Sequence, residues 1–544
     1  RARSATARAS SAGSVGARDE QWRMTSTRRT PSSPRPLSRL HRVRGVAGLL
    51  VLAVLASYLF LLPGLGLARD LADPALGGPG VPQRAIDLHR DLTPRFSRWA
   101  RARVASRQAA DAPLYDVPTT EWPLFTAVFY LMATEALQRD WEQRGGEGEE
   151  PMQRAREAVE AARELVLDPA HHTWVRTHWG DDYMHRENVF FRSLVIAGLT
   201  SHEALTRDGR SLPILRDQVE TLASALDASE LGLLHDYPDE CYPIDVLAAI
   251  GFIRRADAVL GTDHRAFVAR SLRAFEGERA DALGLVPYRA ILPSGDEVQP
   301  ARGIGISWIL LFAPDLWPER ASDWYARYED AFWQDRGWAA GFREYARGTP
   351  GSEWTFEIDA GPVLDGFGTS ASAFGIAAAR RNGRFDHAYT LSSELVASSW
   401  PLPDGTLVTP RVFSHAADAP YLGEAAILYF LTVAPAEGVP IVTGGSASGL
   451  VWLGLFVYFG ASLLAALVIA RGWRRLRRRR SAGVLAPGGR ARERARRADG
   501  SDRSGRADDW TGSHSEGRTF ASSAAASSQP SCRTTSSSVD RPST

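Results

Sequence analysis

The sequence predicts an all-α protein: an (α/α)6 barrel, which is a toroid of six helical hairpins, flanked by two transmembrane helices and disordered tails. Three observations predict this architecture. Apolar residues recur every three or four positions through the centre of the chain, two long uncharged runs lie beside arginine clusters, and long and short connections alternate between the predicted helices. The chain has 544 residues, which is enough for one large folded domain.

The apolar spacing predicts twelve helices in the central region. They are expected at 85–109, 120–143, 151–167, 185–207, 211–227, 243–261, 264–280, 301–313, 317–336, 369–383, 386–396 and 423–433. Short strand pairs are expected at 286–292 and 406–413, within connections.

The connections between these helices predict how the helices are arranged. Short connections follow the second, fourth, sixth, eighth and tenth helices, and a short connection forces neighbouring helices to run antiparallel. All the long connections then emerge on one rim, around a central cavity that is the natural ligand site. The long connections are 110–119, 168–184, 228–242, 281–300, 337–368 and 397–422. A helical solenoid is the alternative, although the sequence shows no fixed repeat.

Two apolar runs predict transmembrane helices at 45–67 and 447–470, because each is long enough to cross a bilayer. Arginines precede the first run and follow the second, and such residues stay on the cytoplasmic side. We therefore expect a two-pass protein of the cell membrane with both termini cytoplasmic and an extracytoplasmic domain at 68–436. A cleaved signal peptide is the alternative for the first run, and two buried core helices are the alternative for both.

The two ends of the chain are expected to be disordered tails. Residues 1–44 are basic and rich in serine, and residues 471–544 are basic and of low complexity. Met24 is a candidate first residue of the native chain.

Composition excludes several classes of function. The chain contains no lysine, which excludes Schiff-base chemistry and a phosphate-loop lysine. Its formal net charge is +1 and its arginine clusters flank apolar runs, so the lipid bilayer, and not nucleic acid, is the expected partner. Cys241 and Cys532 lie on opposite sides of the second apolar run, so neither a disulfide nor a cysteine zinc site is expected. No cofactor is predicted.

The stretch His235–Asp245 has the densest chemistry in the chain, with four carboxylates, a histidine, a cysteine and two tyrosines in eleven residues. The residues before Pro238 and Pro243 are kept out of the helical region, and an apolar helix then begins at Pro243. Paired carboxylates can divide acid and base work when their surroundings separate their pKa values. We expect Asp236 and Asp245 to be the catalytic proton donor and acceptor. Capping of the helix is the alternative role of Asp245.

Two further loops, 171–188 and 343–368, also mix carboxylates with tryptophan or tyrosine. Aromatic walls beside carboxylates suit sugars, or apolar terpenoid-like substrates with one polar end. The predicted substrate-binding residues are Trp179, Asp182, Tyr183, Asn188, Asp239, Tyr242, Tyr288, Trp354 and Asp365. Capping is the alternative for Asp182, and a solvated surface role is the alternative for Asp239 and Glu240.

Histidines gather in the first of these loops, at His171, His172, His178 and His185. Their spacing contains no H-E-x-x-H pattern, and no calcium-loop pattern is present in the chain, so no metal is predicted.

Three short patches resemble the linalool dehydratase/isomerase family. They are Trp179-Gly-Asp-Asp with Glu187-Asn188, then Pro238-Asp239, then Gly361 to Gly368-Thr-Ser-Ala-Ser-Ala-Phe374. The resemblance covers roughly the central domain. It implies an (α/α)6 barrel and, in the family, the dehydration and isomerisation of a monoterpene alcohol.

The resemblance also implies site residues. The family uses two cysteines flanking the Pro-Asp motif, helped by a His, a Tyr and an Asp. Here Asp236 and Asp245 occupy the cysteine positions, Cys241 occupies neither, and the family His corresponds to a position near Leu194. Tyr288 corresponds to a pocket tyrosine. Aspartates can donate and accept protons in place of thiols.

The leading interpretation is therefore a membrane-anchored extracytoplasmic enzyme that performs carboxylate acid/base chemistry, of the hydro-lyase or isomerase type, on an alcohol or terpenoid-like small molecule. One alternative is a glycosidase, because two carboxylates in a helical toroid also resemble inverting six-hairpin glycosidases. Another is a non-catalytic toroid that binds glycan or lipid at the cell envelope. A scaffold for cell-wall or membrane assembly is a third.

Overall fold

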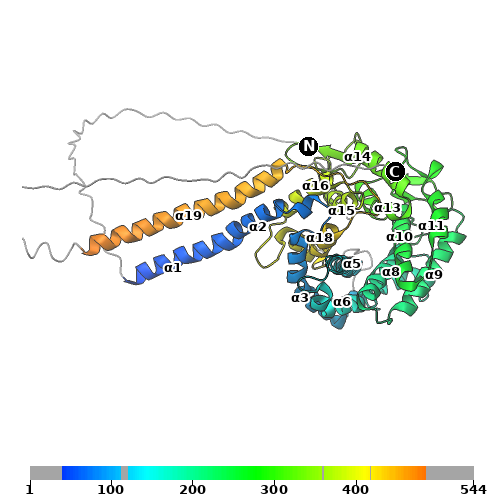
Figure 1. Ribbon diagram of the computed structural model, residues 1–544, viewed down its shortest axis with the longest axis horizontal. Helices are drawn as coiled ribbons and strands as arrows, with labels where there is room; N and C mark the ends of the chain where they lie inside the picture. Colours follow the sequence, from blue (N-terminus) through cyan, green and yellow to red (C-terminus); the bar gives the residue numbers. More distant parts are fainter. Residues whose placement is uncertain (1–38, 112–120, 358–359, 417, 485–544) are drawn as a thin grey trace, which may run out of the picture. The chain divides into compact units, whose positions relative to one another are not determined.

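The computed structural model describes residues 39–111, 121–357, 360–416 and 418–484 (Figure 1). This part of the chain is mainly helical, as predicted, and its short strands all lie in connections. The predicted disordered tails fall mostly outside the described residues. The described ends, 39–44 and 471–484, continue the adjoining apolar helices, because no breaker separates the arginines from those helices.

Helices lie at or within a few residues of all twelve predicted positions. They are α3 (Gln83–Ser106), α5 (Trp122–Gln143), α6 (Pro151–Val166), α8 (Val189–Thr206), α9 (Leu212–Ala228), α10 (Pro243–Leu260), α11 (Arg265–Ser271), α12 (Gly303–Ile309), α14 (Pro318–Phe332), α15 (Thr369–Arg381), α16 (Phe385–Ser398) and α18 (Leu422–Thr432). Two are shorter than expected: α11 passes into 3₁₀ turns, and α12 is followed by the separate helix α13 (Ala313–Leu316). An additional helix, α7 (Thr173–Trp179), lies in the first long loop.

Local sequence sets where these helices begin and end. Proline occupies the first turn of several of them, where its missing N–H has no helical partner to lose: Pro123, Pro151, Pro213, Pro243 and Pro318. Helix α10 ends at Gly261, whose φ of +67° is the left-handed conformation that closes many helices.

Burial separates two kinds of helix. The helices α5, α8 and α10 are apolar and buried on nearly all sides, which is typical of helices inside a fold. Helix α6 instead buries one stripe, for example Ala155, Val159 and Ala162, and exposes charged residues opposite. Figure 1 shows α9 and α11 outside α8 and α10, which they contact.

The buried helices contact one another in a cyclic order. Helix α5 contacts α8, α8 contacts α10, α10 contacts α12, α12 contacts α15, α15 contacts α18, and α18 returns to contact α5. One continuous hydrophobic core, from Leu76 to Val433, lies among and around them. This core falls within the predicted domain at 68–436.

The strands lie in the long connections. The pairs are β1 (Arg289–Ala290) with β2 (Glu297–Gln299) and β3 (Trp333–Asp335) with β4 (Ala340–Phe342), and the three-stranded sheet is β5 (Trp354–Glu357), β6 (Gly361–Leu364) and β7 (Phe367–Gly368). All are antiparallel. The first pair overlaps the strand prediction at 286–292.

The strand prediction at 406–413 is wrong, because these residues lie largely in helix α17 (Val408–Ala416). Pro410 lies in its first turn, where proline is tolerated. Arg411 also donates hydrogen bonds to both carboxylate oxygens of Glu424 on α18. A tertiary contact therefore stabilises a helix that the local pattern did not indicate.

Two helices are long and apolar enough to cross a membrane, Leu40–Leu71 and Gly449–Arg478. The first comprises α1 (Arg39–Ala56), a π-helical turn at Ser57–Leu61 and α2 (Leu62–Leu71), and the second is part of α19 (Gly449–Val484). Only 6 % of each apolar window is buried, so neither is a core helix of the folded domain. Figure 1 shows the two helices side by side.

The two apolar helices pack closely at glycines. A Cβ on Gly64 would lie 2.9 Å from the Cβ of Tyr458, and one on Gly472 would lie 2.8 Å from a methyl group of Leu49. Small residues are the usual means by which membrane helices approach each other closely. Contacts at both ends of the pair show that α1 and α2 run antiparallel to α19.

The helical domain holds this pair through Trp400. Pro63 has no N–H, so it cannot donate to the carbonyl of Leu59 four residues earlier in the helix. The Trp400 indole N–H donates to that carbonyl at 3.0 Å, and the Trp400 ring packs edge-on against Phe60 and Tyr458. The Tyr458 hydroxyl donates to the carbonyl of Ala397. The domain is thus attached where the first apolar helix has an unpaired backbone group.

We expect Gly64→Leu to lower the thermal unfolding temperature of the full-length protein in detergent micelles. The added side chain must displace Tyr458, whose Cβ lies 2.9 Å from the position of the new Cβ, and overpacking of this kind costs about 1–3 kcal/mol. Gly48→Leu is the matched control, because a Cβ at Gly48 meets nothing within 4 Å. Equal unfolding temperatures for the two variants would contradict the close packing at Gly64.

Candidate functional site

A cavity of about 600 Å³ lies among the buried helices. This volume is in the range of pockets that hold small organic molecules. Most of its lining is apolar and aromatic: Trp122, Phe125, Phe129, Trp174, Phe190, Ile244, Ile304, Trp308, Ala373, Phe374, Leu395, Phe413, Leu422, Ala426, Ile427 and Phe430. The ionisable groups of the lining are few: Glu121, His178, Tyr237, Glu240, Tyr242, Asp245 and Tyr288.

The long connections supply part of the cavity lining. His178, Tyr237 and Tyr288 come from three of them, and Gly361 and Phe413 come from two more. The remaining long connection lies almost wholly outside the described residues, but Glu121, which follows it directly, also lines the cavity. The three loops that mix carboxylates with aromatic residues in the sequence therefore meet at one cavity.

The stretch before α10 forms a tight turn at Tyr237–Glu240. The Glu240 N–H donates to the Tyr237 carbonyl at 3.0 Å, and the Asp236 N–H donates to the Glu240 carbonyl at 2.9 Å. Pro238 and Asp239 are the central residues, and Asp239 has a φ of +65°. Proline followed by a residue with positive φ is typical of a type II turn. This turn leads the chain back so that Tyr242 and Asp245 face the cavity at the start of α10.

Asp236 lies behind the cavity wall and is fully buried. Its Oδ2 accepts a hydrogen bond from the Tyr242 N–H at 2.7 Å. Burial raises the pKa of Asp236 well above its usual value, and the nearby Asp245 carboxylate raises it further, whereas hydrogen bonds from the Tyr242 and Phe190 backbone lower it. Burial therefore favours the protonated form of Asp236.

Asp245 lies in the first turn of α10 and lines the cavity. The N-cap residue of α10 is Tyr242, whose side chain makes no capping hydrogen bond and whose N–H is taken by Asp236. Asp245 thus faces the cavity from the first turn of the helix, with Asp236 buried behind it.

Glu121 and Tyr237 form a second polar pair in the lining. The Tyr237 hydroxyl donates to Glu121 Oε1 at 2.8 Å, although the two residues are 116 positions apart in the sequence. Burial, followed by the charge of Glu121, raises the pKa of Tyr237 well above its usual value, so its hydroxyl stays protonated. Glu121 is not among the predicted site residues. In the sequence it is only a single acidic residue before Trp-Pro at a helix start, which is a weak indication of a functional site.

The remaining polar groups are joined to this pair by contacts. The Tyr242 hydroxyl donates to Glu240 Oε2 at 3.0 Å, and its ring packs edge-on against both Tyr237 and Tyr288. Arg289 pairs with Glu240 at 3.0 Å. Glu121, Tyr237, Glu240, Tyr242 and Tyr288 therefore form one connected cluster, and aromatic side chains cover much of the remaining wall.

A buried ion pair supports the cavity wall from behind. The Arg302 Nε donates to Glu344 Oε1 at 2.8 Å, and the Arg302 guanidinium lies 4.6 Å over the Tyr288 ring. The second Glu344 oxygen accepts from the N–H of Ile304, and Gly303 donates its N–H to the Glu344 carbonyl. This pair fixes the start of α12, which brings Ile304 and Trp308 to the cavity.

Of the predicted catalytic residues, Asp245 lines the cavity and Asp236 lies behind it. Of the predicted substrate-binding residues, Tyr242 and Tyr288 line it. The other seven do not: Trp179, Asp182, Tyr183, Asn188, Asp239, Trp354 and Asp365.

These seven have other surroundings. Tyr183 contacts His172, Asp182 pairs with His185, and Trp179 packs against the hydrophobic core. Asn188 is the buried residue before α8, with a φ of +36° that asparagine tolerates. Asp239 and Asp365 lie in turns with positive φ, and Trp354 is 70 % exposed on β5. Sequence spacing placed these residues in the correct loops, but it does not set which way a loop side chain points.

The four loop histidines have different contacts and do not form one site. His171 contacts Asp168, His172 contacts Tyr183, and His185 contacts Asp182 and Asp217, whereas His178 lines the cavity. Within the described ranges, one group has the spacing of three metal ligands: Glu160, His202 and Asp208. Arg210 already pairs with both of its carboxylates, so a cation would have to displace a guanidinium there.

Cys241 is fully buried, and burial raises the pKa of its thiol, so it is a structural residue and not a nucleophile. Cys532 lies outside the described residues.

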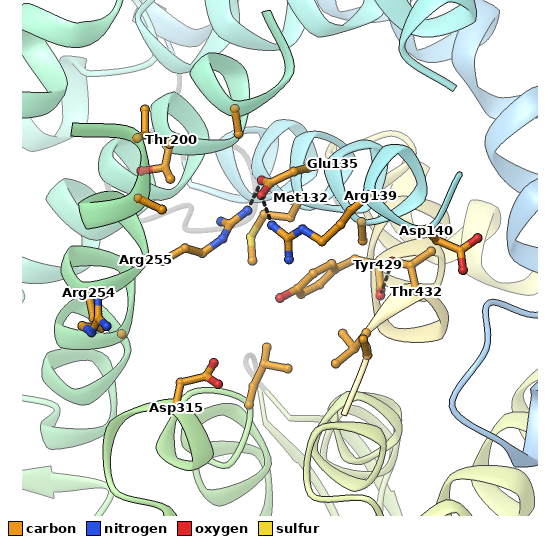
Figure 2. Close-up of a pocket in the computed structure, with 18 of the residues that line it drawn as sticks. Met132, Glu135, Arg139, Asp140, Thr200, Arg254, Arg255, Asp315, Tyr429 and Thr432 are labelled. Atoms are coloured by element: carbon orange, nitrogen blue, oxygen red, sulfur yellow. Dashed lines mark hydrogen bonds and ion pairs between the residues drawn. The ribbon is translucent and has the colours of Figure 1, made fainter. Parts of the chain in front are cut away.

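A second cavity, of about 900 Å³, opens at the other ends of the same buried helices (Figure 2). It is bordered by the short connections, for example at Gly209, Asp315 and Arg381. Its carboxylates are occupied by arginines or by backbone N–H groups. Glu135 bridges Arg139 and Arg255, Asp315 pairs with Arg381, and Asp140 pairs with Arg144. Glu203 accepts from the N–H groups of Gly209 and Ser211. Charge-paired carboxylates are poorly suited to proton transfer, so the first cavity is the better candidate for a functional site.

Buried neutral histidines make the stability of the fold depend on pH. Burial lowers the pKa of His172 to about 4 and that of His89 to about 3, and burial together with Arg384 lowers that of His387 to about 4. An unfolded histidine binds a proton below about pH 6.5. The free energy of unfolding is therefore expected to fall as the pH falls from about 6.5 to about 4, by up to about 1.4 kcal/mol per pH unit for each histidine.

His172→Gln should reduce this acid sensitivity in thermal unfolding measured between pH 4.5 and 7.5. His185→Gln is the control, because hydrogen bonds that His185 donates to the Asp182 and Asp217 carboxylates raise its pKa. That histidine gives stability below about pH 6.5, so its removal should not reduce the loss on acidification. An unchanged pH slope in His172→Gln would contradict the assignment.

The fold and the cavity define the chain as a predominantly helical protein with two helices suited to a membrane. Comparison with known proteins adds no family: no protein-family model matches the chain, and no curated protein matches it.

Proposed function

We propose that the protein is a membrane-anchored enzyme that uses a carboxyl pair, Asp245 and Asp236, for acid/base chemistry on an alcohol or terpenoid-like substrate. The observation that carries the proposal is the pairing itself. A fully buried aspartic acid with a raised pKa lies beside an aspartate that lines an aromatic cavity. Strongly perturbed carboxyl groups at a cavity are typical of active sites. The resemblance of three short patches to linalool dehydratase/isomerase points to the same chemistry.

The proposed architecture is an (α/α)6 barrel, in which α5, α8, α10, α12, α15 and α18 form the inner wall. Their cyclic contacts support it. The positions of the two cavities support it as well, because long connections border one cavity and short connections border the other. In an alternating barrel of helical hairpins, the two kinds of connection lie at opposite ends of the inner helices.

The chemistry we propose is removal of water from an alcohol, with the carboxyl pair holding one shared proton. A proton passes from the pair to the substrate hydroxyl, and the C–O bond breaks with its electrons leaving on water. A proton from the neighbouring carbon then passes to Asp245, and the C–H electrons form the double bond. The pair ends the cycle with one proton, as it began. Asp236 acts as a positioning residue, because it holds the proton behind Asp245 without lining the cavity.

The lining favours an apolar alcohol over a sugar. A sugar needs hydrogen-bonding partners around its whole ring, whereas here most of the ionisable groups form one cluster and most of the wall is aromatic or aliphatic. The inverting-glycosidase alternative needs a second working carboxyl group beside Asp245. The other two carboxylates of the lining are engaged, because Glu121 accepts from Tyr237, and Glu240 accepts from Tyr242 and pairs with Arg289.

The proposed location is the cell membrane, with two spans, both termini in the cytoplasm and the barrel outside. Arginines at 28, 29, 35, 39, 42 and 44 precede the first span, and the basic run Arg471 to Arg480 follows the second, which supports this orientation.

Ligand binding and product analysis on the full-length protein test the proposed function. The protein would be incubated in detergent with a panel of isoprenoid alcohols and oligosaccharides, with thermal shifts and gas chromatography of the products as readouts. We expect shifts and alkene products with the alcohols alone. Asp315→Asn, in the second cavity and 45 % exposed at its side chain, is the matched control and should leave both readouts unchanged. Thermal shifts without products would favour a non-catalytic lipid-binding role, and shifts with oligosaccharides alone would favour a glycan ligand.

A further inference from the structure

The first cavity opens beside helix α17. Pro410, Phe413 and Ser414 of this helix line the cavity, yet Phe413 is also 65 % exposed. A side chain that both lines a cavity and faces outward lies at its mouth. The neighbouring Val412 is 61 % exposed, so the mouth carries a small apolar surface.

The start of α17 lies next to the attachment of the domain to the apolar helices. The Val408 N–H donates to the Trp400 carbonyl, and Thr409 donates its N–H to Ser399. The Trp400 indole in turn donates to the Leu59 carbonyl within the first apolar helix. Two backbone hydrogen bonds and the Trp400 indole therefore hold the start of α17, and with it the cavity mouth, close to a fixed level of that helix.

The position of Leu59 along the first apolar helix corresponds to one surface of a bilayer. About 20 residues cross the hydrocarbon core of a bilayer. Counted from Arg44, the last charged residue before the apolar run, they end near Gly64, only a few residues beyond Leu59. Trp400 packs edge-on against Tyr458 here, with ring centroids 5.0 Å apart, and tryptophan and tyrosine are enriched at membrane interfaces. Asp404 of the same loop pairs with Arg95 of α3, and such an ion pair suits the headgroup layer.

We infer that α17 lies in the outer surface of the lipid bilayer, with Val412 and Phe413 among the lipids, and that the cavity takes its ligand from the membrane. This inference rests on the proposed function for the chemistry of the site, and it narrows the substrate class to a bilayer-dissolved apolar alcohol. The ligand enters past Phe413 with its hydroxyl ahead, toward the cluster of Tyr237, Tyr242 and Asp245. A water-soluble sugar does not dissolve in the bilayer, so an entrance bordered by lipid does not suit it.

The position of α17 is tested first, by spin labelling of the full-length protein in phosphatidylcholine vesicles. Cys532→Ser removes the tail thiol, and Cys241 is fully buried, so a label can be placed on Val412→Cys alone. We expect the label to collide more readily with oxygen than with a water-soluble nickel chelate. Glu220→Cys on α9 is the control and should show the reverse. A Val412 label as accessible to the chelate as the Glu220 label would overturn the membrane contact.

The entry route is tested with radiolabelled farnesol, a C15 isoprenoid alcohol. Val412→Asp places a charge in the lipid without altering the cavity lining. We expect uptake of farnesol from vesicles to slow at least about tenfold, and uptake from detergent micelles to stay unchanged. Unaffected uptake from vesicles, equal slowing in both, or no uptake from either would overturn entry from the membrane. The spin-label result does not depend on the chemistry, so failure of the carboxyl-pair proposal alone would leave it standing.

Discussion

Asp245→Asn is expected to reduce turnover of an apolar alcohol by about 10²–10⁴-fold, because a positioned acid or base contributes that much to a reaction rate. The amide keeps the size and shape of the carboxyl group but does not exchange a proton. Asp245 lies in the first turn of α10 at the cavity surface, and asparagine is also a favourable residue at a helix start, so little stability should be lost. Steady-state product formation and thermal unfolding, measured on the same preparation, check both parts.

Asp236→Asn separates a chemical role of the second carboxyl group from a structural one. The asparagine oxygen can still accept from the Tyr242 N–H, so the turn should survive. In the wild-type protein, activity requires protonated Asp236 and is expected to fall as the pH rises through its raised pKa. In the variant this alkaline limb should disappear from the pH–rate profile, at a lower maximal rate. A retained limb would show that Asp236 only supports the loop.

The largest effect on stability is expected from Glu344→Ala. The variant removes the carboxylate that pairs with Arg302, and Arg302 is only 8 % exposed. A buried charge left without its partner typically costs about 3–5 kcal/mol. Because Glu344 also accepts from the N–H of Ile304, the start of α12 should loosen, and with it the cavity wall at Trp308. Denaturant unfolding of the full-length protein measures the loss.

Two comparisons make the Glu344 result specific. Glu220→Ala removes an exposed partner, 3.8 Å from Arg216, and such pairs are worth about 0–1 kcal/mol. The double variant Arg302→Met with Glu344→Leu removes both charges together, and apolar replacements of a buried pair are often close to neutral. We therefore expect the double variant to be more stable than Glu344→Ala. A double variant that is less stable would assign the effect to the shape of the site and not to the unpaired charge.

The helices were predictable because their signals are local. The apolar spacing at 243–261 and the proline at its start give nearly the same bounds as α10, Pro243–Leu260. The two apolar helices follow from length and lack of charge. The sequence also indicated the loop that contains Asp236 and Asp245, because carboxylates, tyrosines and prolines rarely occur so densely without a role.

Other features depend on contacts that no local window contains. Helix α17 was predicted as a strand pair, and Arg411 pairs there with Glu424 on another helix. Glu121 went unselected because its meaning comes from Tyr237, 116 residues away. Seven predicted binding residues lie in or beside the right loops yet outside the lining, since the direction of a loop side chain is set by the structure packed around it.

Local sequence features were enough to predict the helical class, the positions of the helices, the two long apolar helices and the acidic loop before α10, because periodicity, proline placement and charge act over a few residues. Tertiary packing, in contrast, places Asp245 at the cavity while Asp236 lies behind it. It likewise decided that Trp400 completes the hydrogen bond that Pro63 cannot make to Leu59. Those outcomes depend on which distant segments meet, and burial and hydrogen bonding between such segments exist only once the chain has folded.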